Sequence, residues 1–182
     1  MPKPKFIFSI IGGTKNFQIT DKDRQTEKAF KSALMRAAQI RDCWIITSGV
    51  DAGATQLISK AMKNEKDSKT LTVLGIANRK RIFGKYTEFK KETDGIQNEK
   101  NNFCLNVANS SFIIVDGEED NNFRLKLESH ILNTNKIPFF LFVINGGFST
   151  LRTIATSLEY KMQIVIVSVS FLALNNLKIY DF

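Results

Sequence analysis

Short apolar runs alternate with helical patterns along the whole chain, and this alternation most limits the folds that the chain can adopt. The runs are almost continuous in Ile, Val, Leu and Phe, which is typical of strands buried on both faces of a parallel sheet. Strand–helix–strand repeats form right-handed crossovers, which place helices on both faces of such a sheet. We therefore predict an α/β fold, a Rossmann-like open parallel sheet of about six strands with helices on both faces. The expected strands are Phe6–Ile11, Cys43–Thr47, Leu71–Ala77, Ser111–Val115, Pro138–Ile144 and Gln163–Val169.

Four segments between these runs have the apolar spacing of amphipathic helices. The first is Asp23–Ile40, and Thr20 with Asp23 resembles a capping box at its start. The second, Ala54–Lys63, has one continuous apolar face. The other two are indicated by apolar stripes that we expect to face the core: Phe123, Leu127 and Ile131, and then Leu151, Ile154, Ala155 and Leu158.

The length of 182 residues fits one domain, and we predict a single domain over residues 1–182. One segment interrupts the alternation of strands and helices. Residues 78–108, between the third and fourth expected strands, are long, polar and basic. A loop of this length in a compact domain is usually functional or partly disordered, so we treat residues 78–108 as a basic insertion.

Composition excludes several classes of protein. No apolar run approaches the roughly 18 residues of a membrane helix, and Met1–Lys5 is too short and too charged for a signal peptide. We therefore expect a soluble chain that is not secreted and does not insert into a membrane. Cys43 and Cys104 are the only cysteines and His130 is the only histidine. A His/Cys zinc site is thereby excluded, and a nucleophilic triad would have to use His130, which falls in an expected helix.

The net charge is +8, and its placement is uneven. Residues 1–100 carry a net charge of +9, whereas residues 101–182 carry −1. An excess of this kind attracts phosphate-bearing ligands or acidic partners, although a Lys-rich surface can also serve solubility alone. We expect no nucleic-acid partner, because the chain has no RNP aromatic pair, zinc finger or KH-type loop.

Glycine-rich turns follow three of the expected strands. In an open parallel sheet, ligands bind beyond the carboxyl ends of the strands, where glycine lets the backbone approach a ligand and helix N-termini favour an anion. The sequence therefore favours a phosphate or nucleotide site at this edge. The turns contain Gly12 and Gly13, then Ser48, Gly49 and Gly53, and finally Gly146 and Gly147, followed by the hydroxyl donors Ser149 and Thr150.

Other interpretations of these turns remain open. Each is also compatible with a plain strand-to-helix turn, with glycine for geometry and serine as helix N-cap. Neither a Walker loop nor a G-x-G-x-x-G fingerprint is present, which disfavours a conventional NAD or FAD site. The acidic run Asp116–Asp120 has ligands suitable for a divalent cation, but such loops are usually only solvated, and we expect no metal.

The segment Phe8–Phe17 resembles the opening of the SLOG domain at the cytosolic N-terminus of melastatin-type transient receptor potential (TRPM) cation channels. The similarity continues through Cys43–Gly53, Leu74–Ala77, Asn109–Gly117 and Asn145–Ile154, and it covers roughly residues 5–169. Each motif is weak singly, but their order is specific.

The resemblance implies a cytosolic, regulatory, non-catalytic domain that binds an ADP-ribose-like nucleotide and has no cofactor of its own. It implies other cytosolic domains or subunits of a channel as partners, with a homo-oligomer, a tetramer in the intact channel. The location would be the cytoplasmic side of a membrane, or the cytoplasm for a standalone protein. The ligand-binding residues that it implies are Gly12, Gly13, Lys15, Ser48, Gly49, Gly53, Gly146, Gly147 and Thr150, with phosphate contacts from Arg79 and Arg81.

The same superfamily includes LOG-type phosphoribohydrolases, which carry a Pro-Gly-Gly-x-Gly-Thr-x-x-Glu motif. Aligned on Gly146 and Gly147, this chain has Asn145 in place of the proline, Ser149 in place of the third glycine and Thr153 in place of the glutamate. A threonine cannot supply the carboxylate, so we predict that no residue is catalytic. A LOG-type enzyme and a purely structural assembly domain with a vestigial pocket remain as alternatives.

Overall fold

The computed structural model describes residues 3–13, 24–39, 42–63, 71–79, 82, 103–116 and 120–167. Lys15, Arg81, the expected capping box and most of the basic insertion lie outside these residues. The elements alternate as the sequence predicts. Their order is β1 (Phe6–Gly12), α1 (Arg24–Gln39), β2 (Cys43–Thr47), α2 (Ala54–Lys63), β3 (Thr72–Asn78), β4 (Ser111–Val115), α3 (Asp120–Asn135), β5 (Phe139–Ile144), α4 (Phe148–Glu159) and β6 (Gln163–Val167).

All six strands are parallel and form one sheet in the order β4-β3-β2-β1-β5-β6, so the predicted α/β fold is confirmed. Strand β1 pairs with β2 on one side and with β5 on the other. The chain therefore leaves β1 in one direction and returns to its other side for β5 and β6. Such a reversal of strand order opens a crevice at the carboxyl edge of the sheet, where ligands bind in folds of this class.

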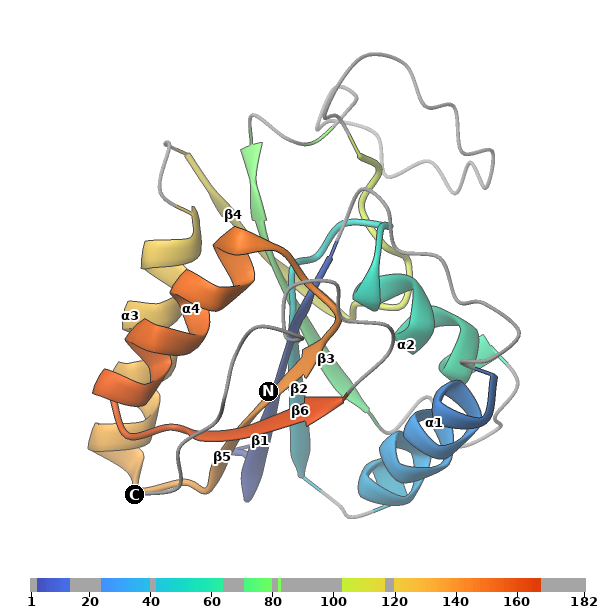
Figure 1. The fold of residues 1–182 in the computed structure, drawn as a ribbon, viewed down its shortest axis with the longest axis horizontal. Coiled ribbons are helices and arrows are strands. Elements are labelled where there is room, and N and C mark those ends of the chain that lie inside the picture. The colour runs from blue at the N-terminus through green and yellow to red at the C-terminus, as the bar shows by residue number, and fades with distance from the viewer. Residues whose placement is uncertain are drawn as a thin grey trace.

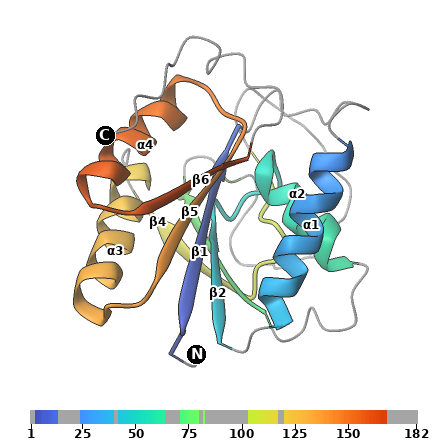
Figure 2. The same cartoon turned by 60° about the horizontal axis from the view of Figure 1, so that its bottom comes forward.

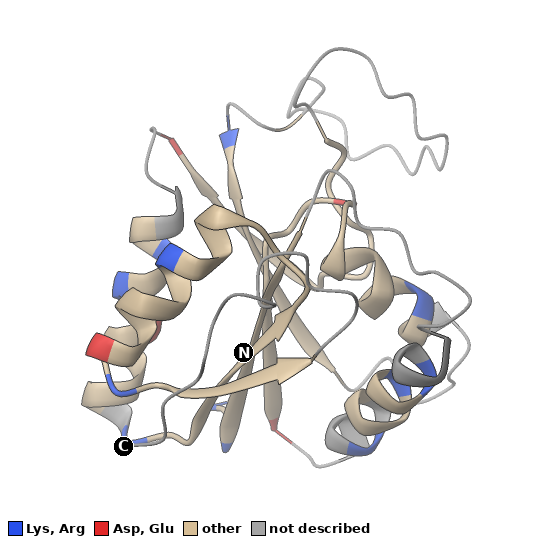
Figure 3. Ribbon diagram, in the orientation of Figure 1, with Lys and Arg blue, Asp and Glu red and all other residues tan. Residues whose placement is uncertain are grey.

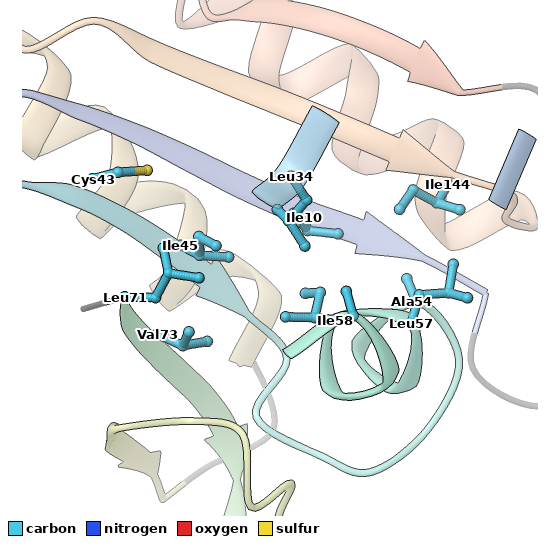
Figure 4. Packing of buried hydrophobic residues seen from close by; sticks show 11 residues of the cluster. Ile10, Leu34, Cys43, Ile45, Ala54, Leu57, Ile58, Leu71, Val73 and Ile144 are labelled. Carbon is cyan, nitrogen blue, oxygen red and sulfur yellow. The ribbon is translucent and has the colours of Figure 1, made fainter. Parts of the chain in front are cut away.

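The helices cover the two faces of the sheet in pairs, as Figures 1 and 2 show: α1 and α2 on one side, α3 and α4 on the other. Under α1 and α2 lies an apolar core, with Leu34 of α1 and Ile58 of α2 packed against Ile10, Ile45 and Val73 of the strands (Figure 4). The core on the opposite face is built around Ile7, Ile46, Ile76 and Phe139, with Leu127 and Ile131 of α3 against it. Apolar burial on both faces fixes the register of the central strands.

Apolar side chains of the two edge strands and of α4 are more exposed than the sequence predicts. In β6 the side chains of Val165 and Ile166 are 39% and 37% exposed, because an edge strand has a neighbour on one side only. In α4, Leu158 is 59% exposed, while the buried positions are Thr150 and Ser157. Ser157 can be buried because its hydroxyl donates to the carbonyl oxygen of Thr153 at 2.8 Å, within the same helix.

The described end of the basic insertion packs against the domain. The Asn106 N–H donates to the carbonyl oxygen of Gly49 at 2.9 Å, and its side-chain amide donates to Asp51 Oδ1 at 2.9 Å. The Asn106 side-chain oxygen accepts a hydrogen bond from the Ser59 hydroxyl of α2 at 2.6 Å, and Asn106 is only 1% exposed. Thr47 Oγ1 likewise donates to Asn109 Oδ1 at 2.8 Å. These bonds hold the loop between β2 and α2 in place.

Charged residues of the described chain lie on the helices and near the ends of the strands, as Figure 3 shows, and no strand contains Lys, Arg, Asp or Glu. Among the described helices, none combines the length and the apolar character needed to cross a bilayer. The described chain also contains no cluster of three or more His, Cys, Asp or Glu side chains suited to a metal ion.

Candidate functional site

A cleft lies at the carboxyl edge of the sheet, where β1 ends and where α2, α3 and α4 begin. It encloses about 130 Å³, whereas pockets that enclose a drug-sized ligand measure roughly 300–1,000 Å³. The cleft can therefore enclose a group the size of a phosphate but not a whole nucleotide. Its lining residues are Ile10, Ile11 and Gly12, then Ser48, Ala52, Ala54 and Thr55, then Arg124 and Leu125 of α3, and Ser149, Thr150 and Thr153 of α4.

Of the residues predicted from the sequence, Gly12, Ser48 and Thr150 line this cleft directly. Gly146 packs against Thr150, since a Cβ at Gly146 would lie only 2.5 Å from the Thr150 hydroxyl. Gly13 is close to Gly146 in turn, because a Cβ at Gly13 would be 3.8 Å from the Gly146 Cα. The first and last glycine turns thus meet at one edge of the sheet, as the sequence predicts.

Other predicted residues lie away from the cleft lining. Gly49 has a φ of +72°, and a Cβ there would lie 3.1 Å from the Gly75 Cα, so glycine is needed for close packing of β2 against β3. Gly53 is buried at the turn into α2 with a φ of +56°. Arg79 is exposed and pairs with Asp116 at 3.3 Å, at the ends of β3 and β4. Lys15 and Arg81 lie outside the described residues.

The first turn of α4 opens onto the cleft without a side-chain cap. Gly147 is the N-cap residue and makes no side-chain hydrogen bond, so the alternative of a plain turn with serine as N-cap does not hold for α4. Its carbonyl oxygen accepts the N–H groups of Thr150 at 3.0 Å and Leu151 at 3.2 Å. Ser149 and Thr150 of this turn line the cleft. Uncapped N–H groups and the helix dipole give such a turn a positive potential, which favours an anion.

Arg124, which no sequence pattern singled out, lines the cleft. It belongs to α3, is 7% exposed and is held by two neighbouring side chains and two strand carbonyls. Its Nε donates to Glu128 Oε1 at 2.8 Å. Its Nη2 donates to Ser9 Oγ at 2.7 Å and to the carbonyl oxygens of Ile10 and Ile46 at 3.0 and 3.2 Å. The Ser9 hydroxyl in turn donates to Glu128 Oε1 at 2.6 Å, so the three side chains form one buried network.

This network fixes the plane of the guanidinium. Two of its nitrogens, Nε and Nη2, are fully engaged by the protein, whereas Nη1 has no hydrogen-bond partner among the residues that the structure describes. Within that same part of the chain, Glu128 Oε2 is buried without a partner. Burying such an ion pair is expensive in desolvation, so a polar network of this kind beside a cleft is a candidate functional feature.

Apart from Arg124, no charged side chain or thiol of the described residues lines the cleft. Among its described lining residues there is no carboxylate, imidazole or thiol. Thr153 lines the cleft, and its hydroxyl donates to the carbonyl oxygen of Ser149 at 3.1 Å. Burial raises the pKa of the Cys43 thiol to about 12, but Cys43 lies in the apolar core under α1 and α2.

A family model described as SLOG in TRPM matches residues 1–174 of the chain. The chain therefore belongs to the SLOG domain family of TRPM channels. This match confirms the resemblance to the SLOG domain of TRPM channels that the glycine turns and the segments between them indicate. The match includes all six strands and both glycine turns that meet at the cleft.

Similar proteins include cation channels of this class. The chain is 27% identical over 188 residues to transient receptor potential cation channel subfamily M member 6 of Mus musculus, and 27% identical over 194 residues to member 2 of the same species. The two alignments cover 91% and 90% of this chain but only 9% and 12% of the relatives, so this SLOG domain spans about a tenth of their length. The channel of Drosophila melanogaster is 27% identical over 179 residues, which are 86% of this chain and 8% of that protein.

Among solved structures, the molybdenum cofactor binding protein from Rippkaea orientalis is similar to this SLOG domain with a TM-score of 0.43 and 15% sequence identity. The alignment covers 91% of this chain and 90% of that chain.

Proposed function

We propose that this SLOG domain is a regulatory, non-catalytic module that binds a nucleotide-like ligand, with ADP-ribose as the reference compound. The observation that carries the proposal is that Arg124 and the uncapped first turn of α4 meet in one cleft. A buried arginine with a nitrogen left unpaired by the described residues provides a charged donor, and the helix turn provides N–H donors beside it.

The size of the cleft supports a phosphate as the group that enters. Phosphate oxygens would accept hydrogen bonds from Arg124 Nη1, from the first N–H groups of α4 and from the hydroxyl groups of Ser48 and Thr150. Arg124, Ser48, Ser149 and Thr150, which carry these donors, line a space of about 130 Å³. Charge-assisted hydrogen bonds of this kind weaken as salt screens them, so affinity should fall with ionic strength.

The family supports a place for this module in a larger channel. We propose that residues 1–182 fold as one SLOG domain on the cytoplasmic side of a TRPM-type cation channel. Its partners would be other cytosolic domains or subunits, in a homo-oligomer that is a tetramer in the intact channel. Regulation would act through the ligand, because a ligand with different affinities for two channel states shifts the balance between those states.

The cleft supports a non-catalytic role because its described lining has no carboxylate. Cleavage of an N-glycosidic bond develops positive charge on the ribose, which a carboxylate stabilises, whereas this cleft presents Arg124. Purified protein should therefore release no adenine from AMP above a heat-killed control. Release of adenine would instead favour the LOG-type enzyme.

Calorimetric titration with ADP-ribose tests the binding proposal. Arg124→Lys keeps the charge at the cleft but loses the planar geometry, and it should weaken binding at least tenfold. Arg152→Lys is the matched control, because Arg152 is an exposed arginine of α4 that does not line the cleft. No heat and no thermal shift at millimolar ADP-ribose would overturn the proposal in favour of a structural assembly domain.

A further inference from the structure

Two exposed aromatic side chains are next in the chain to residues that line the cleft. Phe148 is 83% exposed and Phe123 is 40% exposed, and they are the two aromatic residues among the large exposed hydrophobic residues that the structure describes. Each immediately precedes a residue that lines the cleft: Phe148 precedes Ser149, and Phe123 precedes Arg124. They lie in the first turns of α4 and α3, two helices that pack together on the same face of the sheet (Figure 1).

An exposed phenylalanine of this kind contributes little to the core of the domain. Phe148 belongs to none of the apolar core clusters of the described chain. The space around the preceding Gly147 is also open, since a Cβ added there would meet no other atom within 4 Å. An exposed aromatic side chain beside this open turn, next in the chain to a residue that lines the cleft, can accept a flat ring.

The volume of the cleft places the base of a nucleotide outside it. A space of about 130 Å³ takes the phosphate, and no aromatic side chain is among the described residues that line it. The base of a bound nucleotide must then lie outside the cleft, and the two exposed aromatic residues adjoin its lining residues in the chain.

We propose that Phe148 is the platform on which the base of the bound nucleotide stacks, and that Phe123 is a second, weaker contact of the same base. This inference rests on the proposed nucleotide-binding function. Stacking uses the π-face that every base has, so it does not depend on the hydrogen-bonding edge of the base. The domain should therefore distinguish a nucleotide from a sugar phosphate more strongly than it distinguishes adenine from guanine.

The test compares two probes, AMP and ribose 5-phosphate, which share the phosphate and differ by the base. The unmodified protein should bind AMP about tenfold more tightly, a modest share of the stacking gain seen at aromatic platforms. Phe148→Ala should bring the two dissociation constants together, whereas Phe148→Tyr should keep the preference. Phe123→Ala should reduce the preference by a smaller factor.

Leu158→Ala is the matched control, because Leu158 is an exposed apolar residue at the other end of α4, and it should leave the preference unchanged. All variants should unfold at the temperature of the unmodified protein, since the substituted residues are exposed. If the Phe148→Ala variant keeps the full preference for AMP and still binds ribose 5-phosphate, base stacking on Phe148 is overturned, whereas phosphate binding in the cleft is supported. If the unmodified protein binds neither probe, the proposed function is overturned and the platform with it.

Discussion

Both faces of the sheet have an apolar core, but within the described residues only one of them also holds a buried ion pair, and β1 shows the difference within two residues. Ile10 points toward α1 and α2, into a cluster of buried apolar side chains. Ser9 points to the opposite face, where it is fully buried and bonded to Arg124 and Glu128 of α3. That face has its own apolar cluster, which includes Ile7 of the same strand, so the charged network is added to a hydrophobic core.

This contrast indicates that the charged network is not optimised for stability. Apolar burial stabilises a fold in proportion to the area removed from water, whereas an ion pair at 7% and 0% exposure carries a large desolvation cost. The network lies under the cleft, and Arg124 lines it. We infer that the network is retained for the site that it positions, so the two faces should respond differently to substitution.

The largest effect is expected from removing one partner of the network. Arg124→Met leaves the Glu128 carboxylate buried without its cation, and it should lower the free energy of unfolding by about 3–5 kcal/mol. The double variant Arg124→Met with Glu128→Leu should recover most of this loss, because well-packed apolar residues can replace a buried ion pair. Urea denaturation of both variants measures the difference. A loss below about 1 kcal/mol in the single variant would mean that the network is not buried in solution.

A smaller effect is expected on the apolar face, without any effect on the site. Ile45 is fully buried in β2, and Ile45→Ala should lower the free energy of unfolding by about 2–4 kcal/mol through lost burial and the cavity left behind. The dissociation constant for ADP-ribose, measured well below the unfolding temperature, should not change. A tenfold weaker affinity would show instead that the two faces of the sheet are coupled.

The smallest effect concerns Cys43 on the apolar face. Burial raises the pKa of its thiol from 9.0 to about 12, so the folded protein keeps a proton that the unfolded chain releases. The stabilisation is complete below pH 9 and decreases as the pH rises from 9 toward 12. When the pH is raised from 8 to 10, the free energy of unfolding of the Cys43→Ala variant should fall by about 1 kcal/mol less than that of the unmodified protein.

Cys104→Ala provides the control for this pH dependence, because Cys104 is exposed. The free energy of unfolding of this variant should change with pH in the same way as that of the unmodified protein. A thiol reagent at pH 8 should modify Cys104 in the folded protein and Cys43 only after unfolding. Rapid modification of Cys43 in the folded state would contradict its burial.

The sequence predicts the strands well because their signal is local. The bounds of β2, β4 and α2 agree with the prediction to the residue, since each apolar run or stripe ends at a polar or glycine-rich segment. The meeting of Gly12 and Gly13 with Gly146 also follows from the sequence, because parallel strands bring their carboxyl ends to one edge.

Arg124 could not be predicted in the same way. Its bond to Ser9 joins residues 115 positions apart, and its carbonyl acceptors belong to two different strands. Only Glu128, four residues further along α3, is a local signal, and such pairs are common on solvated helices. The exposure of Leu158 was missed for a related reason: spacing identifies an apolar stripe, but the position of α4 at the sheet edge decides which residues it buries.

If the buried network on one face of the sheet makes the cleft a binding site, removing the network should abolish binding without unfolding the protein. Calorimetric titration with ADP-ribose should compare the Arg124→Met, Glu128→Leu double variant with the unmodified protein, because this variant should be folded and close to native stability. We expect the unmodified protein to bind with an affinity that falls as salt rises, and the double variant to give no heat. Equal binding by the two proteins would show that the network does not make the site.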